Sequence, residues 1–506
     1  MNLMRTKSIE QSIADTEEPE HQLRKQLGPL QLTVFGVGVI IGTGIFVLTG
    51  EAAGAKAGPA VALSFVFSGI ACALAALCYA EFASTVPVAG SAYTFSYASL
   101  GELVAWIIGW DLILELALGA STVAVGWSTY FADVMSEAGI TIPTWAYSVN
   151  PDAPGVQHNF VAAAIVLILT AVICLGIKVS SQVNFVMVVI KLSIVLLVII
   201  AGLFFIKSGN YSPFIPPSGS PAAEGAPPTP SLLQDFGLAP GAFGFSGIFT
   251  GAALVFFAYI GFDIVATAAE ETKNPQRDMP IGILSSLGIC TVLYVAVSLV
   301  VTGMVKYTDI KVEAPLAEAF RSVGHPGIAT TISVGALIGL TTVMMILMLG
   351  QSRVFFAMSR DRMLPAVFSK VSPRFGTPIR TSITTGVVVA LISTFVPLTD
   401  LAELVNIGTL FAFVLVAIGV LVLRRTRPDL ERAFRCPGVP VVPILAVLAA
   451  VYLMLNLPGA TWIRFFVWMA IGIVVYLVYG ARRSRLATDP NYSREADASS
   501  AERRAT

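Results

Sequence analysis

The sequence predicts an all-α integral membrane protein with twelve transmembrane helices. The chain has 506 residues, of which 56% are hydrophobic and only 12% are charged, against about 25% charged residues in an average soluble protein. Its mean hydropathy is +0.80. Its apolar residues form continuous runs of helical length, not the short alternating segments of a membrane β-barrel. This composition excludes an ordinary soluble enzyme and a disordered chain.

Twelve apolar runs follow one another along the chain. A helix needs roughly 20 apolar residues to cross a bilayer, so twelve crossings use about half of the chain. The predicted spans are residues 31–56, 59–83, 99–132, 160–177, 182–207, 246–270, 280–305, 328–352, 381–397, 403–423, 441–457 and 461–480.

Lysines and arginines are distributed unevenly between the two sides of this predicted bundle. If the N-terminus is cytoplasmic, 24 of the 31 basic residues fall on the inner side and six on the outer side, with Lys191 inside a span. Because basic loops stay in the cytoplasm, we expect a multi-pass protein of the plasma (inner) membrane with both termini cytoplasmic. The polar first 30 residues do not have the pattern of a cleavable signal peptide.

Spans 1 and 6 are each interrupted near the middle, by residues 41–45 (IGTGI) and 260–263 (IGFD). A glycine inside a helix costs ~1 kcal/mol relative to alanine. A bilayer also tolerates open backbone only where it faces protein or a watery cavity. Matching breaks predict two five-helix halves, the second inverted because five is odd, with a midplane site as in secondary transporters. The earlier glycines, Gly36 and Gly38, are expected to be sites of close helix packing.

The expected organisation follows from these breaks and from the loop composition. Eight prolines in residues 211–240 predict a linker-like external loop. The expected parts are a cytoplasmic tail (1–28), a first repeat of spans 1–5 (29–207), the external loop (208–245), a second repeat of spans 6–10 (246–426), spans 11 and 12 (427–480) and a second cytoplasmic tail (481–506).

The broken helices offer complementary chemistry. The half-helix that begins after Gly44 leaves free N–H groups at Thr43, Gly44 and Ile45, and a helix N-terminus readily binds a carboxylate. The half-helix that ends near Phe257 leaves free carbonyls at Phe257, Ala258 and Ile260, which can accept hydrogen bonds from an ammonium group. Opposed helix ends of this kind predict recognition of the zwitterionic backbone of an amino acid.

Lys191 lies about nine residues into span 5, where an uncompensated charge costs roughly 2.5–3.5 kcal/mol. Such a lysine either exchanges a proton during a transport cycle or forms a static ion pair between helices. Candidate partners are Glu115, Asp111 and Asp263. Asp111 and Glu115 share a helix face, and the deeper Glu115 is the expected partner of Lys191. Asp111 is expected to satisfy polar groups of a neighbouring helix.

Other classes of function lack their sequence signals. The five cysteines show no CxxC spacing, so a disulfide framework or a metal site is not expected and the cysteines are interpreted as small buried hydrophobes. The net charge of +0 and the absence of a strong basic patch argue against nucleic-acid binding. No cofactor and no enzymatic activity are expected. A channel would need charge rings or carbonyl filters, but an exchanger would share every residue named above.

Several segments resemble the amino acid–polyamine–organocation superfamily and, within it, a bacterial twelve-span member of the cationic amino acid transporter family. They are GVIIGTGIFVLTG (38–50), AALCYAEFASTVPVAGSAYTFSY (75–97), GELVAWIIGWDLILE (101–115), FFAYIGFDIVATAAEETKNPQRDMPIGI (256–283) and AFRCPGVPVVP (433–443). The resemblance implies the LeuT-like five-plus-five inverted repeat, discontinuous helices 1 and 6, and alternating access. It also implies that residues 84–98 and 353–380 are inner loops.

The resemblance also assigns expected roles to individual residues. Phe257 is implied as a gate over the substrate. Lys191 matches a lysine that takes the place of a sodium ion in proton-coupled relatives. The expected substrate-binding residues are Ile40, Ile41, Gly42, Thr43, Gly44, Ile45, Phe257, Ala258 and Ile260, and the expected proton-coupling residues are Lys191, Glu115 and Asp263.

The expected partners are an amino acid, protons and membrane lipids, while the oligomeric state and any small membrane partner stay open. The apolar face of span 8 around residues 344–348 favours small neutral substrates such as alanine. Arginine or lysine becomes plausible if Glu115 or Asp263 faces the substrate. We therefore expect proton-coupled symport of neutral L-amino acids, with a cationic amino acid transporter or an exchanger as the alternatives.

Overall fold

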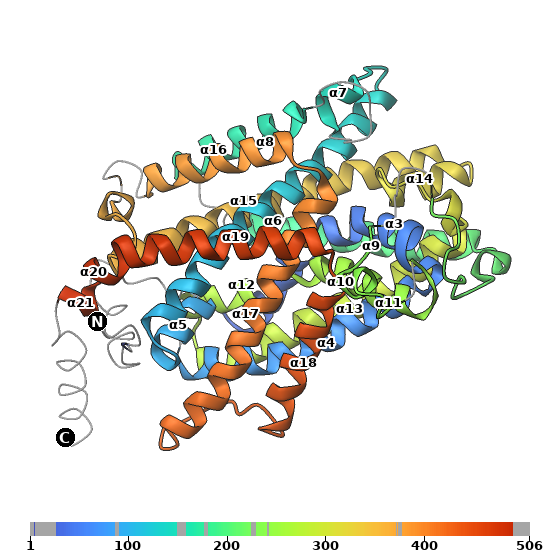
Figure 1. Cartoon of the computed structure of the whole chain (residues 1–506). Helices are drawn as coiled ribbons and strands as arrows, with labels where there is room; N and C mark the ends of the chain where they lie inside the picture. The colour runs from blue at the N-terminus through green and yellow to red at the C-terminus, as the bar shows by residue number, and fades with distance from the viewer. Residues whose placement is uncertain are drawn as a thin grey trace.

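The computed structural model describes residues 5, 27–86, 91–148, 158–176, 181–223, 229–239, 242–370, 372 and 377–488. These residues are organised in helices, and their only β-structure is an isolated bridge between Leu27 and Thr272. The expected all-α class is therefore confirmed for the described part of the chain. Figure 1 shows the helices packed side by side in one bundle.

Eight helical stretches are long and apolar enough to cross a bilayer, and four further apolar helices are shorter. Together they cover all twelve of the predicted runs. The first half of predicted span 1 is the short helix Pro29–Ile40, and its second half is continuous with span 2 in Gly44–Thr85. The eight are Gly44–Thr85, Glu102–Glu137, Asn184–Phe205, Gly244–Ala269, Pro275–Met304, Pro326–Arg360, Leu398–Thr426 and Gly459–Arg483; the four are Pro29–Ile40, Phe160–Cys174, Ile379–Phe395 and Val441–Leu455.

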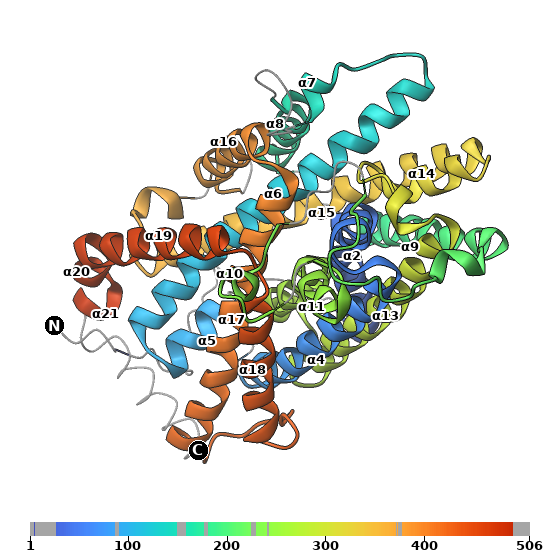
Figure 2. The same ribbon diagram turned by 45° about the vertical axis from the view of Figure 1, so that its right-hand side comes forward.

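The helices form a central group with others around it. Helix α6 (Glu102–Glu137) packs against α15 (Pro326–Arg360) and α17 (Leu398–Thr426). Helix α13 (Pro275–Met304) packs against α2 (Pro29–Ile40) and α4 (Val61–Thr85). Helices α8 (Phe160–Cys174) and α16 (Ile379–Phe395) lie together at one edge in both views (Figures 1 and 2). The remaining long helices are α9 (Ser181–Gly202), α11 (Gly244–Val255), α18 (Val441–Leu455) and α19 (Gly459–Val475).

The outer surface of the bundle carries many large apolar side chains. Leu167 and Ile168 on α8, Phe185 on α9, and Ile463 and Phe466 on α19 are all exposed. Water-soluble proteins rarely expose contiguous apolar patches of more than a few hundred Å². A surface of this kind instead suits the hydrocarbon of a lipid bilayer, where the chain gains nothing from burying these groups against itself.

Two helices occur where the sequence analysis placed loops. Residues 91–99 form α5, whose aromatic side chains Tyr93, Phe95 and Tyr97 are buried as α5 packs against α6 and α17. Residues 315–322 form α14, which begins with Pro315 at its first turn and buries Leu316 and Phe320 on one face. Both helices are short, and α14 is amphipathic whereas α5 is buried with polar residues among its aromatic ones, so a search for long apolar runs passes over them.

The external loop and the tails are only partly described. Within the predicted loop, Ser208–Tyr211 and Leu232–Asp235 are short helical turns. The loop also contacts the C-terminal end of predicted span 1, since the Lys56 ammonium donates to the Thr229 carbonyl at 2.8 Å. At the other end of the chain, the segment expected to be a tail continues as short helices to Thr488. Apart from Arg5, Leu27 and Gly28, the rest of both tails lies outside the described residues.

Candidate substrate site between two broken helices

Both predicted helix interruptions are present in the structure. Helix α2 ends at Ile40, and helical backbone resumes at Gly44–Leu48 (η1) after a short irregular stretch. In span 6, α11 ends at Val255, a 3-10 turn covers Phe256–Tyr259 (η6), and α12 (Phe262–Val265) begins after Gly261. Each span therefore presents helix ends inside the bundle.

The two breaks touch each other at two glycines. A Cβ atom on Gly44 would lie 2.2 Å from the Cα of Ala258, so the backbones of spans 1 and 6 meet there without room for a side chain. Gly261 has φ +121°, a conformation that side-chain-bearing residues rarely adopt, and a Cβ there would lie 2.7 Å from Val39 of span 1. These contacts hold the two breaks together as a crossed pair. In contrast, Gly36 lies against Ser286 and Gly38 against Val188, so these two glycines are packing sites as predicted.

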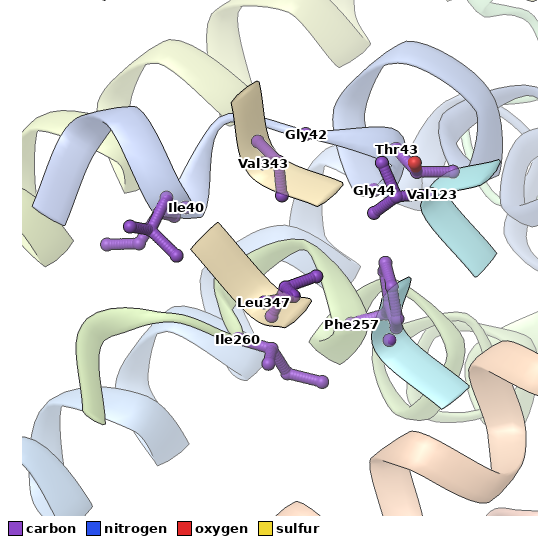
Figure 3. A pocket seen from close by; sticks show the side chains of 11 residues that line it. Ile40, Gly42, Thr43, Gly44, Val123, Phe257, Ile260, Val343 and Leu347 are labelled. Carbon is purple, nitrogen blue, oxygen red and sulfur yellow. The ribbon is translucent and has the colours of Figure 1, made fainter. Parts of the chain in front are cut away.

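A cavity opens between the breaks and two neighbouring helices (Figure 3). The space open to the centre of a water molecule is about 20 Å³, so the cavity is narrow in this state. In Figure 3 the side chains of Val343 and Leu347 on α15 face those of Phe257 and Ile260 on span 6 across this space. The residues that line it are Val39, Ile40, Gly42, Thr43, Gly44, Gly119, Val123, Phe257, Ile260, Val343 and Leu347.

The polar groups on the span 1 side of the cavity are unpaired. Thr43 has the one polar side chain in the lining, and its buried hydroxyl oxygen has no hydrogen-bond partner among the described residues. No hydrogen bond is recorded in the described chain for the backbone N–H of Thr43, Gly44 or Ile45. A buried, unpaired polar group is costly unless a ligand satisfies it. This side can therefore donate several hydrogen bonds to a carboxylate.

The span 6 side differs from the expectation of three free carbonyls. The Phe257 carbonyl accepts from the Ile260 N–H at 3.2 Å. The Tyr294 hydroxyl of α13 lies 2.9 Å from the Ala258 carbonyl and 2.7 Å from the Ile40 carbonyl. A phenol has one proton to donate, so these two carbonyls compete for it, and each keeps a lone pair. Sequence reasoning missed Tyr294, because nothing local to span 7 indicates that it meets both breaks.

The cavity contains most of the predicted substrate-binding residues and some that were not predicted. Ile40, Gly42, Thr43, Gly44, Phe257 and Ile260 line it, whereas Ile41, Ile45 and Ala258 do not. Gly119 and Val123 on α6, and Val343 and Leu347 on α15, were missed as individual residues. Each of these pairs is four residues apart and shares a helix face. That spacing was a usable signal only once both helices were known to face the breaks.

Lys191 does not form the expected ion pair with Glu115. Its ammonium donates instead to the Gly38 carbonyl, with the two atoms 2.5 Å apart, and its side chain is 1% exposed. The aliphatic stem lies against Gly339 of α15. Lys191 therefore joins span 5 to spans 1 and 8. Gly38 is close to the end of α2, and the last carbonyls of a helix have no N–H partner within it, which explains why a cation finds an acceptor there.

The three acidic candidates lie elsewhere in the bundle and differ in their contacts. Neither carboxylate oxygen of Glu115 or Asp111 has a hydrogen-bond partner among the described residues. The expectation that Asp111 satisfies polar groups of a neighbouring helix is therefore not met, and its carboxylate lies against Gly408 of α17. Asp263 accepts a hydrogen bond from the Gly261 N–H at 3.2 Å and lies in the first turn of α12, where a carboxylate is favourable.

Comparison with known proteins connects this geometry to a family. The family model described as amino acid permease matches residues 27–479. The chain belongs to the amino acid permease family. The expected membership of the amino acid–polyamine–organocation superfamily is thereby confirmed, and the permease carries its broken helices inside the matched region.

Relatives of this permease have several named substrates. It is 47% identical to the branched-chain amino acid permease BcaP of Bacillus subtilis (96% of this chain, 99% of the relative). It is 45% identical to the methylthioribose transporter of the same organism (96% and 99%). It is also 31% identical to the vacuolar cationic amino acid transporter 4 of Arabidopsis thaliana (96% of each chain). These relatives are transporters and permeases, so the permease is a membrane transport protein and not an enzyme.

Proposed function

We propose that this permease is a proton-coupled symporter that takes neutral L-amino acids, from alanine to the branched-chain amino acids, into the cell across the plasma membrane. The observation that carries the proposal is the cavity between the two breaks. In this proposal the chain crosses the membrane twelve times with both termini cytoplasmic. Residues 29–207 and 246–426 are the two inverted repeats, and the site opens alternately to either side.

The cavity lining supports a neutral substrate. The substrate carboxylate would bind the Thr43 hydroxyl and the open N–H groups of span 1, and its ammonium would bind the carbonyl side of span 6. Its side chain would then lie against Val123, Val343 and Leu347. No charged side chain lines this space, and a cationic side chain placed there would lose its hydration without compensation. The similarity to a branched-chain amino acid permease agrees with this choice.

The position of Lys191 supports proton coupling. A charged Lys191 donates to the Gly38 carbonyl and ties span 5 to span 1. A neutral lysine keeps donors, but it loses the stronger charge-assisted bond. Loss of the proton would therefore loosen span 1 from span 5, and proton release into the cytoplasm would accompany opening of the site. Transport would then depend on the proton gradient.

Uptake into proteoliposomes tests the proposal directly. Labelled alanine, leucine and arginine are offered in parallel, with and without an inward proton gradient, and unlabelled methylthioribose is added as a competitor. Gradient-driven accumulation of alanine or leucine is the expected result. Accumulation of arginine alone would move the permease to the cationic alternative. Exchange with internal amino acid and no response to the gradient would make it an antiporter.

Replacing Tyr294 by phenylalanine is expected to weaken the apparent affinity for the substrate. The change removes the one hydroxyl that joins the Ile40 and Ala258 carbonyls, and a buried hydrogen bond contributes about 0.5–1.5 kcal/mol, which corresponds to roughly a two- to tenfold rise in KM. Tyr259→Phe is the matched control, because its hydroxyl donates to the Phe65 carbonyl, which does not line the cavity. Equal KM values in the two variants would contradict a role at the breaks.

Replacing Glu115 by glutamine is expected to flatten the dependence of uptake on external pH. An unpaired buried carboxylate is stable chiefly in its protonated form, and a neutral amide imitates that form at every pH, so folding is preserved. Asp111→Asn is the control, since Asp111 lies one turn away on the same helix face. Uptake that retains the parental pH profile in Glu115→Gln would remove this carboxylate from the coupling mechanism.

A further inference from the structure

A buried polar cluster joins the inner end of α4 to the segment between α17 and α18. The Glu81 carboxylate accepts two hydrogen bonds from the Arg424 guanidinium, at 3.0 and 2.6 Å. It also accepts one from the backbone N–H of Cys436 at 2.8 Å. Arg424 donates in addition to the Cys436 carbonyl at 3.0 Å. These contacts fix Cys436 against α4.

Another cysteine, Cys78 of α4, lies near the Glu81 carboxylate. Cys78 precedes Glu81 by three residues, so the two side chains lie on one helix face. The side chains of Cys78 and Cys436 lie close enough to affect each other, and their residues are 0% and 2% exposed. The Cys436 thiol also lies 3.8 Å from the Pro437 carbonyl. The described chain holds all five cysteines as free thiols, and the proposed mechanism uses neither member of this pair.

The surroundings of Cys436 favour reaction at its sulfur. The neighbouring Cys78 thiol and the Arg424 guanidinium hold the pKa of Cys436 below its ordinary value, although burial and the Glu81 carboxylate act in the opposite direction. The thiolate is the nucleophilic form of cysteine, so a lowered pKa beside a cation increases the reactive fraction. Redox-sensing cysteines are often found next to a second cysteine that completes a disulfide.

We propose that Cys78 and Cys436 are a reversible disulfide pair that responds to hydrogen peroxide. The Cys436 thiolate attacks one peroxide oxygen, an S–O bond forms, the O–O bond breaks and hydroxide leaves. The Cys78 thiol then attacks the sulfur of the resulting sulfenic acid. The S–S bond forms, the S–O bond breaks, and the released hydroxide combines with the thiol proton as water. In sum, two thiols and one peroxide give one disulfide and two waters, and a dithiol reverses the change.

The disulfide would convert a contact between two side chains into a covalent bond. Span 2 would be tied to the chain that connects spans 10 and 11. Helices α17 and α18 already pack against α4, so the cross-link needs little rearrangement in this state. A state in which span 2 moves relative to span 10 would become inaccessible. Oxidation of the pair would therefore inhibit transport.

Peptide mapping of the full-length protein in proteoliposomes tests the pair. After treatment with hydrogen peroxide, a linked peptide that contains Cys78 and Cys436, lighter by two hydrogens, is the expected product, and dithiothreitol should remove it. Uptake should fall to a small fraction of its untreated rate and recover with dithiothreitol. Cys78→Ser and Cys436→Ser should abolish both effects. Cys72→Ser, on the same helix and equally buried, should keep them.

Two results would overturn the proposal. One is a map in which Cys78 and Cys436 stay free under peroxide that oxidises the half-buried Cys174. The other is a complete Cys78–Cys436 disulfide with unchanged uptake. The mapping does not depend on the identity of the substrate, so failure of the proposed amino acid symport in untreated protein is distinguishable from failure of the disulfide. Alanine variants at both positions replace the serine variants if those do not fold.

Discussion

Lys191→Ala is expected to abolish proton-driven accumulation and to leave the permease folded. The substitution removes the charged contact with the Gly38 carbonyl and with it the proposed proton site between spans 5, 1 and 8. Without a group that binds the proton in one state and releases it in the other, the gradient has no differential affinity to act on. Substrate would then only equilibrate across the membrane. Removing a buried cation also relieves the cost of keeping it in the bilayer, so stability should not fall.

Three measurements on this variant distinguish a loss of proton coupling from a loss of folding. Accumulation against a gradient should be lost, exchange between equal internal and external substrate should persist, and thermal stability in detergent should match that of the parent. Lys207→Ala is the control, because Lys207 is an exposed lysine at the outer end of the same span. Accumulation with a normal pH profile in Lys191→Ala would contradict the coupling role.

Gly44→Ala is expected to cause the largest loss of substrate affinity among single-methyl changes at the breaks. A Cβ atom at this position would lie 2.2 Å from the Cα of Ala258, against the backbone of span 6. Spans 1 and 6 must therefore separate, and overpacking of this kind costs about 1–3 kcal/mol, or roughly 5- to 150-fold in affinity if all of it falls on the bound state.

Gly42→Ala is the matched control for this change. Its Cβ would lie 3.4 Å from Val343, which is an ordinary contact across the cavity. It should lower affinity for leucine more than for alanine and leave the breaks in contact. Substrate binding by both purified variants, measured as a substrate-dependent rise in melting temperature, separates the two effects. Equal affinities for Gly44→Ala and Gly42→Ala would mean that the contact with Ala258 does not matter for binding.

The sequence predicted those features that local chemistry determines. Long apolar runs predicted the helices. The glycines at 42, 44 and 261 predicted both breaks, because a glycine destabilises a helix at its own position. The cavity walls were harder to predict. Val343 lines the cavity while the adjacent Met344 is fully buried elsewhere, and no property of an apolar helix distinguishes the two. Only the way α15 packs against the breaks decides between them.

The partner of Lys191 could not be predicted for a similar reason. A sequence displays the charge of Glu115, but it does not display a backbone carbonyl near the end of a half-helix, so the search for an opposite charge led to the wrong acceptor. The hydrogen bonds of the Tyr294 hydroxyl could not be predicted either, since their carbonyl acceptors are far from Tyr294 in the chain.

The crossed glycine contacts divide the site into a part that resists variation and a part that permits it. In the proposed binding mode, the amino and carboxyl groups of the substrate meet the Thr43 hydroxyl and main-chain atoms whose spacing is set by Gly44 against Ala258 and Gly261 against Val39. The opposite wall is formed by Gly119, Val123, Val343 and Leu347, which take no part in the two glycine contacts between the breaks. Replacing a few wall residues on α6 and α15 would therefore change which substrate side chains the proposed site accepts, while the contacts between the two breaks stay the same.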